Sequence, residues 1–129
     1  MRGGVGATTT GEDLFAFGGS PSGSYPFPRG PRAGIDIGVS NGVVSRQKPP
    51  GPQGASTYID PTRASLTGHY YRLPGGTPLP KGFDVFADGA DVGGTMPRGH
   101  RTVYPTVDMT FDEFVSGFRQ LGWQYGGKI

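Results

Sequence analysis

The chain has 129 residues, no cysteine and a formal net charge of +2. Its length predicts one domain with a modest core, and the lack of cysteine excludes disulfide bonds and thiolate chemistry. Lysine and arginine are scattered singly, which disfavours nucleic acid as a partner. No apolar run approaches the ~20 residues that a membrane span needs.

Glycine and proline are unusually frequent, at 25 and 13 residues, but the chain also has 8 Phe, 6 Tyr and 1 Trp. Disordered chains are poor in aromatic residues. We therefore expect a single compact, loop-rich domain over residues 11–129, preceded by a disordered N-terminus over residues 1–10. No apolar segment at the N-terminus could serve as a secretory signal. The sequence thus predicts a soluble protein made in the cytoplasm, with any export following another route.

The first part of the chain predicts short strands separated by loops. Residues 14–17 form the first predicted strand, and residues 20–34, rich in Pro, Gly and Ser, form an irregular loop. The alternating stretch 35–39, the turn dipeptide Asn41-Gly42 and the following residues 43–45 together predict a β-hairpin.

The segment 54–60, Gly-Ala-Ser-Thr-Tyr-Ile-Asp, is the first candidate for a functional site. Gly54 and Ala55 leave room for a ligand to approach the backbone. Ser56 and Thr57 supply hydroxyls that donate or accept hydrogen bonds. The alternative is a loop that runs into a short strand, with both hydroxyls bound to local backbone. From the residues alone, this structural alternative is favoured.

Three more strands are predicted, at residues 68–73, 83–86 and 100–104. The only histidines, His69 and His100, lie at the start of two of these strands. If these converged on one cleft, they could supply the general base and general acid of a metal-free ribonuclease. For each histidine alone, a hydrogen-bonded structural role is favoured.

The end of the chain predicts one amphipathic helix. Thr110 is a favourable N-cap, and Glu113 three residues later completes a capping box. Gly122 is a suitable stop. The apolar residues that follow the helical spacing are Phe111, Phe114, Val115, Phe118 and Leu121. The predicted architecture is therefore α+β: a small, mostly antiparallel sheet with this helix on one face.

No metal site is expected. The histidines lack the spacing of a zinc motif, and no thiol is available. Asp84, Asp88 and Asp91 surround Gly89 but do not fit a calcium loop, so turn backbone and solvent are their expected partners. The many glycines lack the strand–Gly–helix context of a phosphate-binding or dinucleotide motif.

Several short segments, in their order along the chain, carry a resemblance to a known family. They are Gly54–Asp60, Gly68–Leu73, Gly76–Pro80, Val85–Gly89 and His100–Pro105 with Met109. Over this stretch, which is more than half of the chain, the sequence resembles the small toxins of the type VI secretion effector family with an ADP-ribosyltransferase-like fold. The segment Asp13–Gly18 is similar to the family's first strand.

This resemblance implies a split β-sandwich that clasps NAD and cleaves the nicotinamide–ribose bond through an oxocarbenium-like state. Ser56 and Thr57 would line the nicotinamide pocket, and His100 would reach into the same cleft. Tyr58 or Tyr70 would stack on the nicotinamide ring, although aromatic residues at strand positions more often belong to a core. The ADP-ribose acceptor would be a macromolecule or water. Delivery into target cells and an inhibitory immunity protein are also implied.

The resemblance assigns the first strand, with Phe15, Ala16 and Phe17, to the NAD site. The family has an arginine that grips the NAD phosphates or ribose at the position of Ala16. Alanine cannot make such a bidentate contact. One hypothesis is therefore that this chain is a toxin inactivated at Ala16. In that case, expression of the Ala16→Arg variant should be toxic to the host cell.

The family's catalytic glutamate has no clear counterpart either. Glu12 and Glu113 are the only glutamates, and Glu113 is expected to cap the helix. Either an aspartate substitutes, or the hydroxyls and His100 carry the reaction. Two alternatives stay open beside the NAD-dependent toxin: a metal-independent ribonuclease using His69 and His100, and a non-catalytic module whose aromatic residues bind a sugar or a protein.

Overall fold

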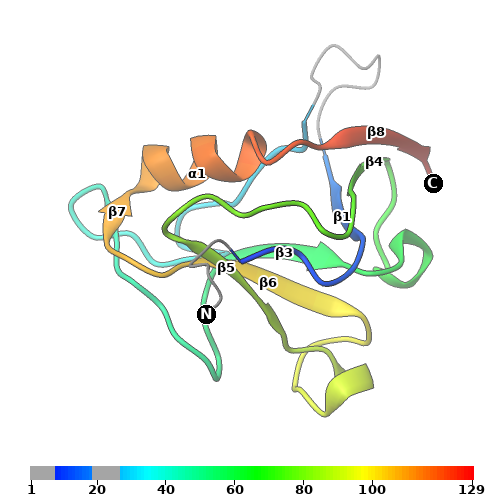
Figure 1. The fold of residues 1–129 in the computed structure, drawn as a ribbon, viewed down its shortest axis with the longest axis horizontal. Coiled ribbons are helices and arrows are strands. Elements are labelled where there is room, and N and C mark those ends of the chain that lie inside the picture. Colours follow the sequence, from blue (N-terminus) through cyan, green and yellow to red (C-terminus); the bar gives the residue numbers. More distant parts are fainter. Residues whose placement is uncertain (1–7, 19–26) are drawn as a thin grey trace.

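The computed structural model describes residues 8–18 and 27–129 (Figure 1). Antiparallel strands and one α-helix form the predicted α+β fold. The elements are β1 (Leu14–Phe17), β2 (Val43–Val44), β3 (Ala55–Tyr58), β4 (His69–Leu73), β5 (Phe83–Ala87), β6 (His100–Pro105), β7 (Met109–Thr110), α1 (Phe111–Arg119) and β8 (Gln124–Lys128). No helix in the described ranges is long and apolar enough to cross a membrane.

Six strands form one sheet in the order β5-β6-β3-β1-β4-β8, and β2 pairs with β7 in a separate two-stranded sheet. The larger sheet has a short junction at its centre. Four residue pairs join β3 to β6, and four join β1 to β4, but the single pair Phe15 with Tyr58 joins β1 to β3. The sheet therefore consists of two three-stranded halves that meet at one point.

The two faces of the sheet have different surroundings. Consecutive side chains of a strand point to opposite faces, so β6 presents His100 and Thr102 on one face and Arg101 on the other. The register pairs Ser56 with Thr102 and Tyr58 with His100. We call the face with these residues the site face, and the opposite one the core face.

Helix α1 covers the core face (Figure 1). The predicted capping box is confirmed: Thr110 Oγ1 accepts from the backbone N of Glu113 at 3.0 Å, and Glu113 Oε1 accepts from the backbone N of Thr110 at 2.8 Å. Gly122, just beyond the helix, has a φ of +114°, which side-chain-bearing residues rarely adopt. The core includes Leu14, Ala55, Tyr71, Leu73, Val103, Phe114 and Phe118.

The strand predicted at residues 35–39 is wrong. The stretch folds into a turn in which the carboxylate of Asp36 accepts a hydrogen bond from the backbone N of Arg32 at 2.7 Å. A side chain that binds nearby backbone gives the chain an alternative to a strand ladder. Asn41 and Gly42 do form the predicted turn, with φ of 53° and 76°, but β2 beyond it pairs with β7.

The N-terminal segment is bonded into the fold at Thr10. The Thr10 side chain donates to the carbonyl of Pro74 at 3.0 Å, and its backbone N donates to the carbonyl of Thr77 at 3.0 Å. The predicted disorder therefore does not extend to Thr10, which is buried. The remainder of that prediction, residues 1–7, lies outside the described residues, as do residues 19–26 of the predicted irregular loop.

Strand β8 is an element that the sequence analysis missed. It pairs antiparallel with β4, with a bulge between Tyr70 and Tyr71. Consecutive glycines argue against a strand. Here a Cβ at Gly126 would overlap the ring of Tyr70, so glycine is what allows that ring to lie against the strand.

Candidate functional site

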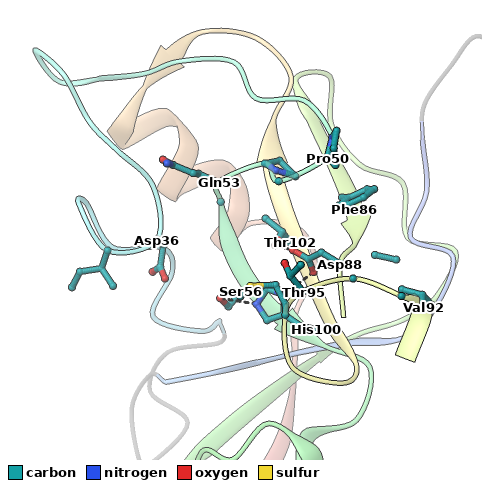
Figure 2. A pocket seen from close by; sticks show the side chains of 18 residues that line it. Asp36, Pro50, Gln53, Ser56, Phe86, Asp88, Val92, Thr95, His100 and Thr102 are labelled. Carbon is teal, nitrogen blue, oxygen red and sulfur yellow. Dashed lines mark hydrogen bonds and ion pairs between the residues drawn. The ribbon is translucent and has the colours of Figure 1, made fainter. Parts of the chain in front are cut away.

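A chain of hydrogen bonds joins side chains from β3, β6 and the end of β5 (Figure 2). His100 Nε2 lies 3.0 Å from Ser56 Oγ, and His100 Nδ1 lies 2.7 Å from Asp88 Oδ1. The second oxygen of Asp88 accepts from the hydroxyl of Thr102. A carboxylate accepts the Nδ1–H, so Nε2 of the neutral ring accepts from the Ser56 hydroxyl. Because Ser56 is exposed and His100 is buried, the hydroxyl is the part that a ligand can reach.

Glycine residues allow these groups to approach one another. A Cβ at Gly54 would overlap the carbonyl oxygen of Val103, so glycine lets β3 begin close against β6. A Cβ at Gly94 would overlap the carbonyl of Asp88, and the backbone N of Met96 donates to that same carbonyl at 3.0 Å. The segment between β5 and β6 thus folds tightly around Asp88 and fixes its carboxylate behind the imidazole.

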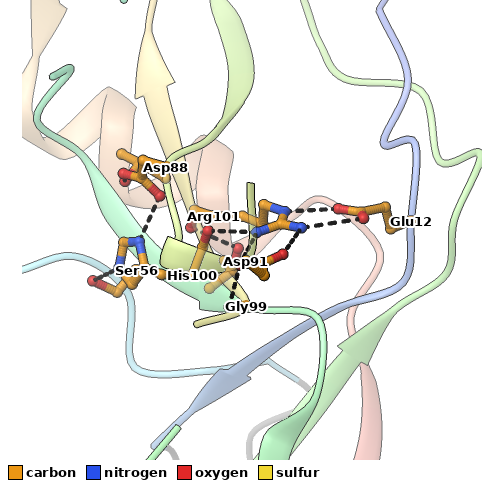
Figure 3. A network of polar contacts seen from close by, with 9 residues as sticks. Glu12, Ser56, Asp88, Asp91, Gly99, His100 and Arg101 are labelled. Carbon is orange, nitrogen blue, oxygen red and sulfur yellow. Dashed lines mark hydrogen bonds and ion pairs between the residues drawn. The ribbon is translucent and has the colours of Figure 1, made fainter. Parts of the chain in front are cut away.

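Arg101 anchors this arrangement from the core face (Figure 3). Its side chain is 3% exposed and forms ion pairs with Glu12 at 2.8 Å and with Asp91 at 2.9 Å. Asp91 also accepts from the backbone N of Gly99 at 2.6 Å. The Arg101 hydrogen bonds, followed by that of Gly99, hold the pKa of Asp91 well below its ordinary value. Since Arg101 and His100 are consecutive, this anchor also sets the position of the imidazole.

The Ser56–His100–Asp88 chain lies in the wall of a pocket of about 580 Å³. The other walls are largely apolar and come from separate segments, including Pro50 and Phe86 (Figure 2). Pockets that bind small molecules typically have about 300–1,000 Å³ and combine apolar walls with a few polar groups. The pocket therefore has the size and the lining of a small-molecule site.

A second pocket, of about 390 Å³, adjoins the first because Asp36 and Ser56 line both. It lies at the junction of the two half-sheets, with Ala16 and Phe17 on β1 and Ser56 and Tyr58 on β3 in its lining. Two arginine side chains from the loop before Asp36 line it as well. His100 is thus among the lining residues of the first pocket, and Arg29 and Arg32 are among those of the second.

Tyr58 lies between these features. It is half-buried, and its ring meets the imidazole of His100 edge-on, with centroids 5.2 Å apart. Burial, followed by the negative charges of Asp36 and Asp88, raises the pKa of Tyr58. The neutral phenol is therefore the form present at neutral pH, and its ring is available to contact an aromatic ligand.

The structure brings together two of the three sequence-predicted catalytic residues, Ser56 and His100. The third, Thr57, points to the core face, where it is fully buried and its hydroxyl donates to the carbonyl of Arg101 at 2.9 Å. Thr57 is thus in the structural role that its residue type alone favoured, and it does not line either pocket.

The sequence-predicted NAD-binding residues fall into two groups. Ala16, Phe17 and Tyr58 line the second pocket. Phe15 and Tyr70 do not line either of the two pockets. Their rings meet edge-on with centroids 6.0 Å apart, and the centroids of Tyr70 and Phe17 are 5.9 Å apart. These two residues therefore pack with other aromatic side chains of the site face and do not form a pocket wall.

His69 is not part of this site. Its Nδ1 lies 2.7 Å from the hydroxyl of Tyr125, and β4 is separated from β6 by β1 and β3. Three strand spacings amount to about 14 Å. The fold thus does not bring His69 and His100 together, as the ribonuclease alternative requires. Within residues 8–18 and 27–129, no group of three or more His, Cys, Asp or Glu side chains could hold a metal ion.

Sequence reasoning missed Asp88 and Asp36 as site residues. The pattern predicts a turn at Asp88, because this residue follows a strand and precedes Gly89, and its only functional signal is its place in a segment of family resemblance. Asp36 lies inside a stretch whose alternation predicts a strand. No protein-family model matches the chain, and no curated protein matches it significantly, so the geometry of these groups has to carry the functional interpretation.

Proposed function

We propose that this protein cleaves the nicotinamide–ribose bond of NAD. The observation that carries the proposal is that two adjoining pockets share Ser56 and Asp36 as lining residues. One pocket holds the imidazole chain, and the other holds two arginine side chains. NAD has a reactive nicotinamide–ribose end and an anionic diphosphate, so it matches a site with these two parts.

Asp36 is the residue that we assign to charge stabilisation. Positive charge develops on the ribose as the bond to nicotinamide breaks, and a fixed carboxylate nearby lowers the energy of that state. Asp36 is partly buried and lines both pockets beside Ser56. Of the two alternatives to the missing glutamate, we therefore propose the one in which an aspartate substitutes, and we assign it to Asp36.

Ser56 and His100 would handle the proton of the attacking group. Nicotinamide leaves with the electron pair of the broken C–N bond, and water forms the new C–O bond and loses a proton. His100 Nε2 takes up that proton through the Ser56 hydroxyl, and Asp88 stabilises the resulting imidazolium. The products are nicotinamide, ADP-ribose and one proton. Transfer to a macromolecule follows the same course, with the acceptor in place of water.

The family resemblance supports the same function. We propose that the sheet is the split β-sandwich of ADP-ribosyltransferase-like toxins, because its two halves meet at one residue pair and the second pocket lies at their junction. Delivery as a toxin and inhibition by an immunity protein remain predictions from the resemblance alone.

The test is nicotinamide release from NAD by the purified protein. Ser56→Ala and His100→Gln are each expected to lower the rate by about a hundredfold or more, because each removes the group that handles the proton. Thr57→Val is the matched control: it alters the adjacent hydroxyl on the core face, and we expect it to cost about 1 kcal/mol of stability while the rate stays unchanged. No release from the wild-type protein at millimolar NAD would contradict the proposal.

The Ser56–His100–Asp88 chain favours a second candidate, an acyl hydrolase in which Ser56 is the nucleophile. A fluorophosphonate probe separates the two reactions. Labelling that is lost in Ser56→Ala, together with no nicotinamide release, would favour the hydrolase. Nicotinamide release without labelling would favour the cleavage of NAD.

A further inference from the structure

The match of the second pocket to an anionic diphosphate depends on two arginines, to which the proposed reaction steps assign no individual role. Arg29 and Arg32 both line this pocket. Arg32 Nε lies 3.4 Å from Asp36 Oδ2, which leaves its two terminal nitrogens without a bond to any described residue. The side chain of Arg29 is exposed and has no hydrogen bond or ion pair within residues 8–18 and 27–129. Both guanidinium groups are therefore available to an anion.

Residues 28–30, which include Arg29, pack against the rest of the fold. Pro28 is fully buried. A Cβ at Gly18 would overlap the Cβ of Arg29, so the Arg29 backbone lies directly against the end of β1. A Cβ at Gly30 would touch the side chain of Arg119 on α1. The backbone of Arg29 is thus held at the pocket while its side chain stays exposed.

Ala16 lines the same pocket as these arginines and is 3% exposed. Its methyl group takes little of the space, so the pocket stays open on the β1 side. The positive charge that β1 lacks is instead supplied by the loop between β1 and Asp36.

We propose that Arg29, assisted by Arg32, binds the diphosphate of the dinucleotide in the second pocket. The identity of the ligand rests on the proposed function. A guanidinium group pairs bidentately with phosphate oxygens, and no described carboxylate competes for Arg29. It follows that the chain can bind the diphosphate without an arginine at position 16.

The experiment measures binding of ADP-ribose by calorimetry, which requires no catalysis. Arg29→Ala is expected to weaken binding about tenfold or more, as the loss of charge-assisted hydrogen bonds implies. Because Arg29 has no described partner, this variant is expected to fold normally, which circular dichroism can check. Arg63→Ala is the matched control: it removes the same charge from an exposed side chain outside both pockets and should leave the affinity unchanged.

Adenosine, which has no phosphate, should bind the wild-type protein and Arg29→Ala equally. Equal ADP-ribose affinity in these two proteins would overturn the inference, as would the absence of ADP-ribose binding or binding that appears only in Ala16→Arg. Binding that depends on Arg29 without release of nicotinamide from NAD would support the inference and contradict the proposed reaction. If Arg29→Ala cleaves NAD with an unchanged KM, the proposed reaction would be supported and the inference about Arg29 contradicted.

Discussion

The roles of individual residues in this protein depend on which face of the sheet they occupy. Ser56 and Thr57 are consecutive hydroxyls, yet one is exposed in two pockets and the other is fully buried. Local sequence identifies the pair but cannot tell them apart, because the distinction depends on which face α1 covers. Asp88 is a similar case, since its partner His100 is brought beside it by the fold of the intervening loop.

Asp88→Asn tests whether this carboxylate orients the imidazole. An amide can donate to Nδ1 and favour the tautomer with its proton on Nε2, which can no longer accept from Ser56. We expect nicotinamide release to fall about a hundredfold or more, with little change in KM. The ¹⁵N resonances of His100 should report the tautomer change. Thr102→Val, which removes only the bond to the second carboxylate oxygen, should keep the original tautomer.

An unchanged His100 tautomer in Asp88→Asn would contradict this orienting role. A loss of rate through unfolding alone would lower activity but would not exchange the tautomer in the protein that remains folded. The spectrum therefore separates a positioning role from a merely structural one.

At the scale of elements, sequence analysis succeeds where the determinants of an element lie within a few residues of each other. The capping box of α1 is complete within Thr110 and Glu113, and the aromatic and β-branched strands carry their own propensity. Sequence analysis fails where a tertiary or side-chain contact determines the local structure. In β8, a Cβ at Gly126 would overlap the ring of Tyr70, and in the alternating stretch at 35–39 the side chain of Asp36 binds the Arg32 backbone.

The Asp91–Arg101 ion pair makes a prediction about pH. The pKa of Asp91 is lowered in the fold, so the stability it contributes is complete above its ordinary carboxyl pKa and is lost as the pH falls toward the lowered value. In urea unfolding at pH 7, the Asp91→Asn variant should have a lower free energy of unfolding than the wild-type protein. The difference between the two free energies should shrink below about pH 4. A difference of the same size at pH 7 and pH 3 would contradict the assignment.

Gly117 in α1 gives a prediction whose sign is opposite to helix propensity. Replacing a helical glycine by alanine usually stabilises by about 0.5–1 kcal/mol. Here a Cβ would overlap the ring of Phe83, which is stacked on Phe114 with centroids 5.6 Å apart. We expect Gly117→Ala to destabilise by about 1–3 kcal/mol in urea unfolding. In a Phe83→Leu background the same change should cost less; an equal cost would show that the ring is not the obstacle.

At the scale of the whole molecule, few backbone pairs join the two half-sheets. Besides the pair Phe15–Tyr58, the segment before β1 spans them: Asp13 binds Arg72 on β4, and Glu12 binds Arg101 on β6. The residue patterns predict most of the strands but not this division, and only the family resemblance implies a split sheet. The division depends on pairing between strands that are distant along the chain.

A ligand bound across this junction should act on both halves. We expect ADP-ribose to slow amide hydrogen exchange in β1 and β3, which line the second pocket, because a bound ligand suppresses local opening. Strand β8 lies outside both pockets and serves as the internal control. Protection confined to β8, with β1 and β3 unchanged, would place the ligand elsewhere.

The adjacency of His100 and Arg101 also limits how this protein can diverge. A substitution that breaks the ion pairs of Arg101 is expected to disturb the backbone of β6 at His100 as well, so changes at the two positions are coupled. Transplanting the pocket that His100 lines onto another scaffold would therefore also need the charged residues on the reverse side of the strand.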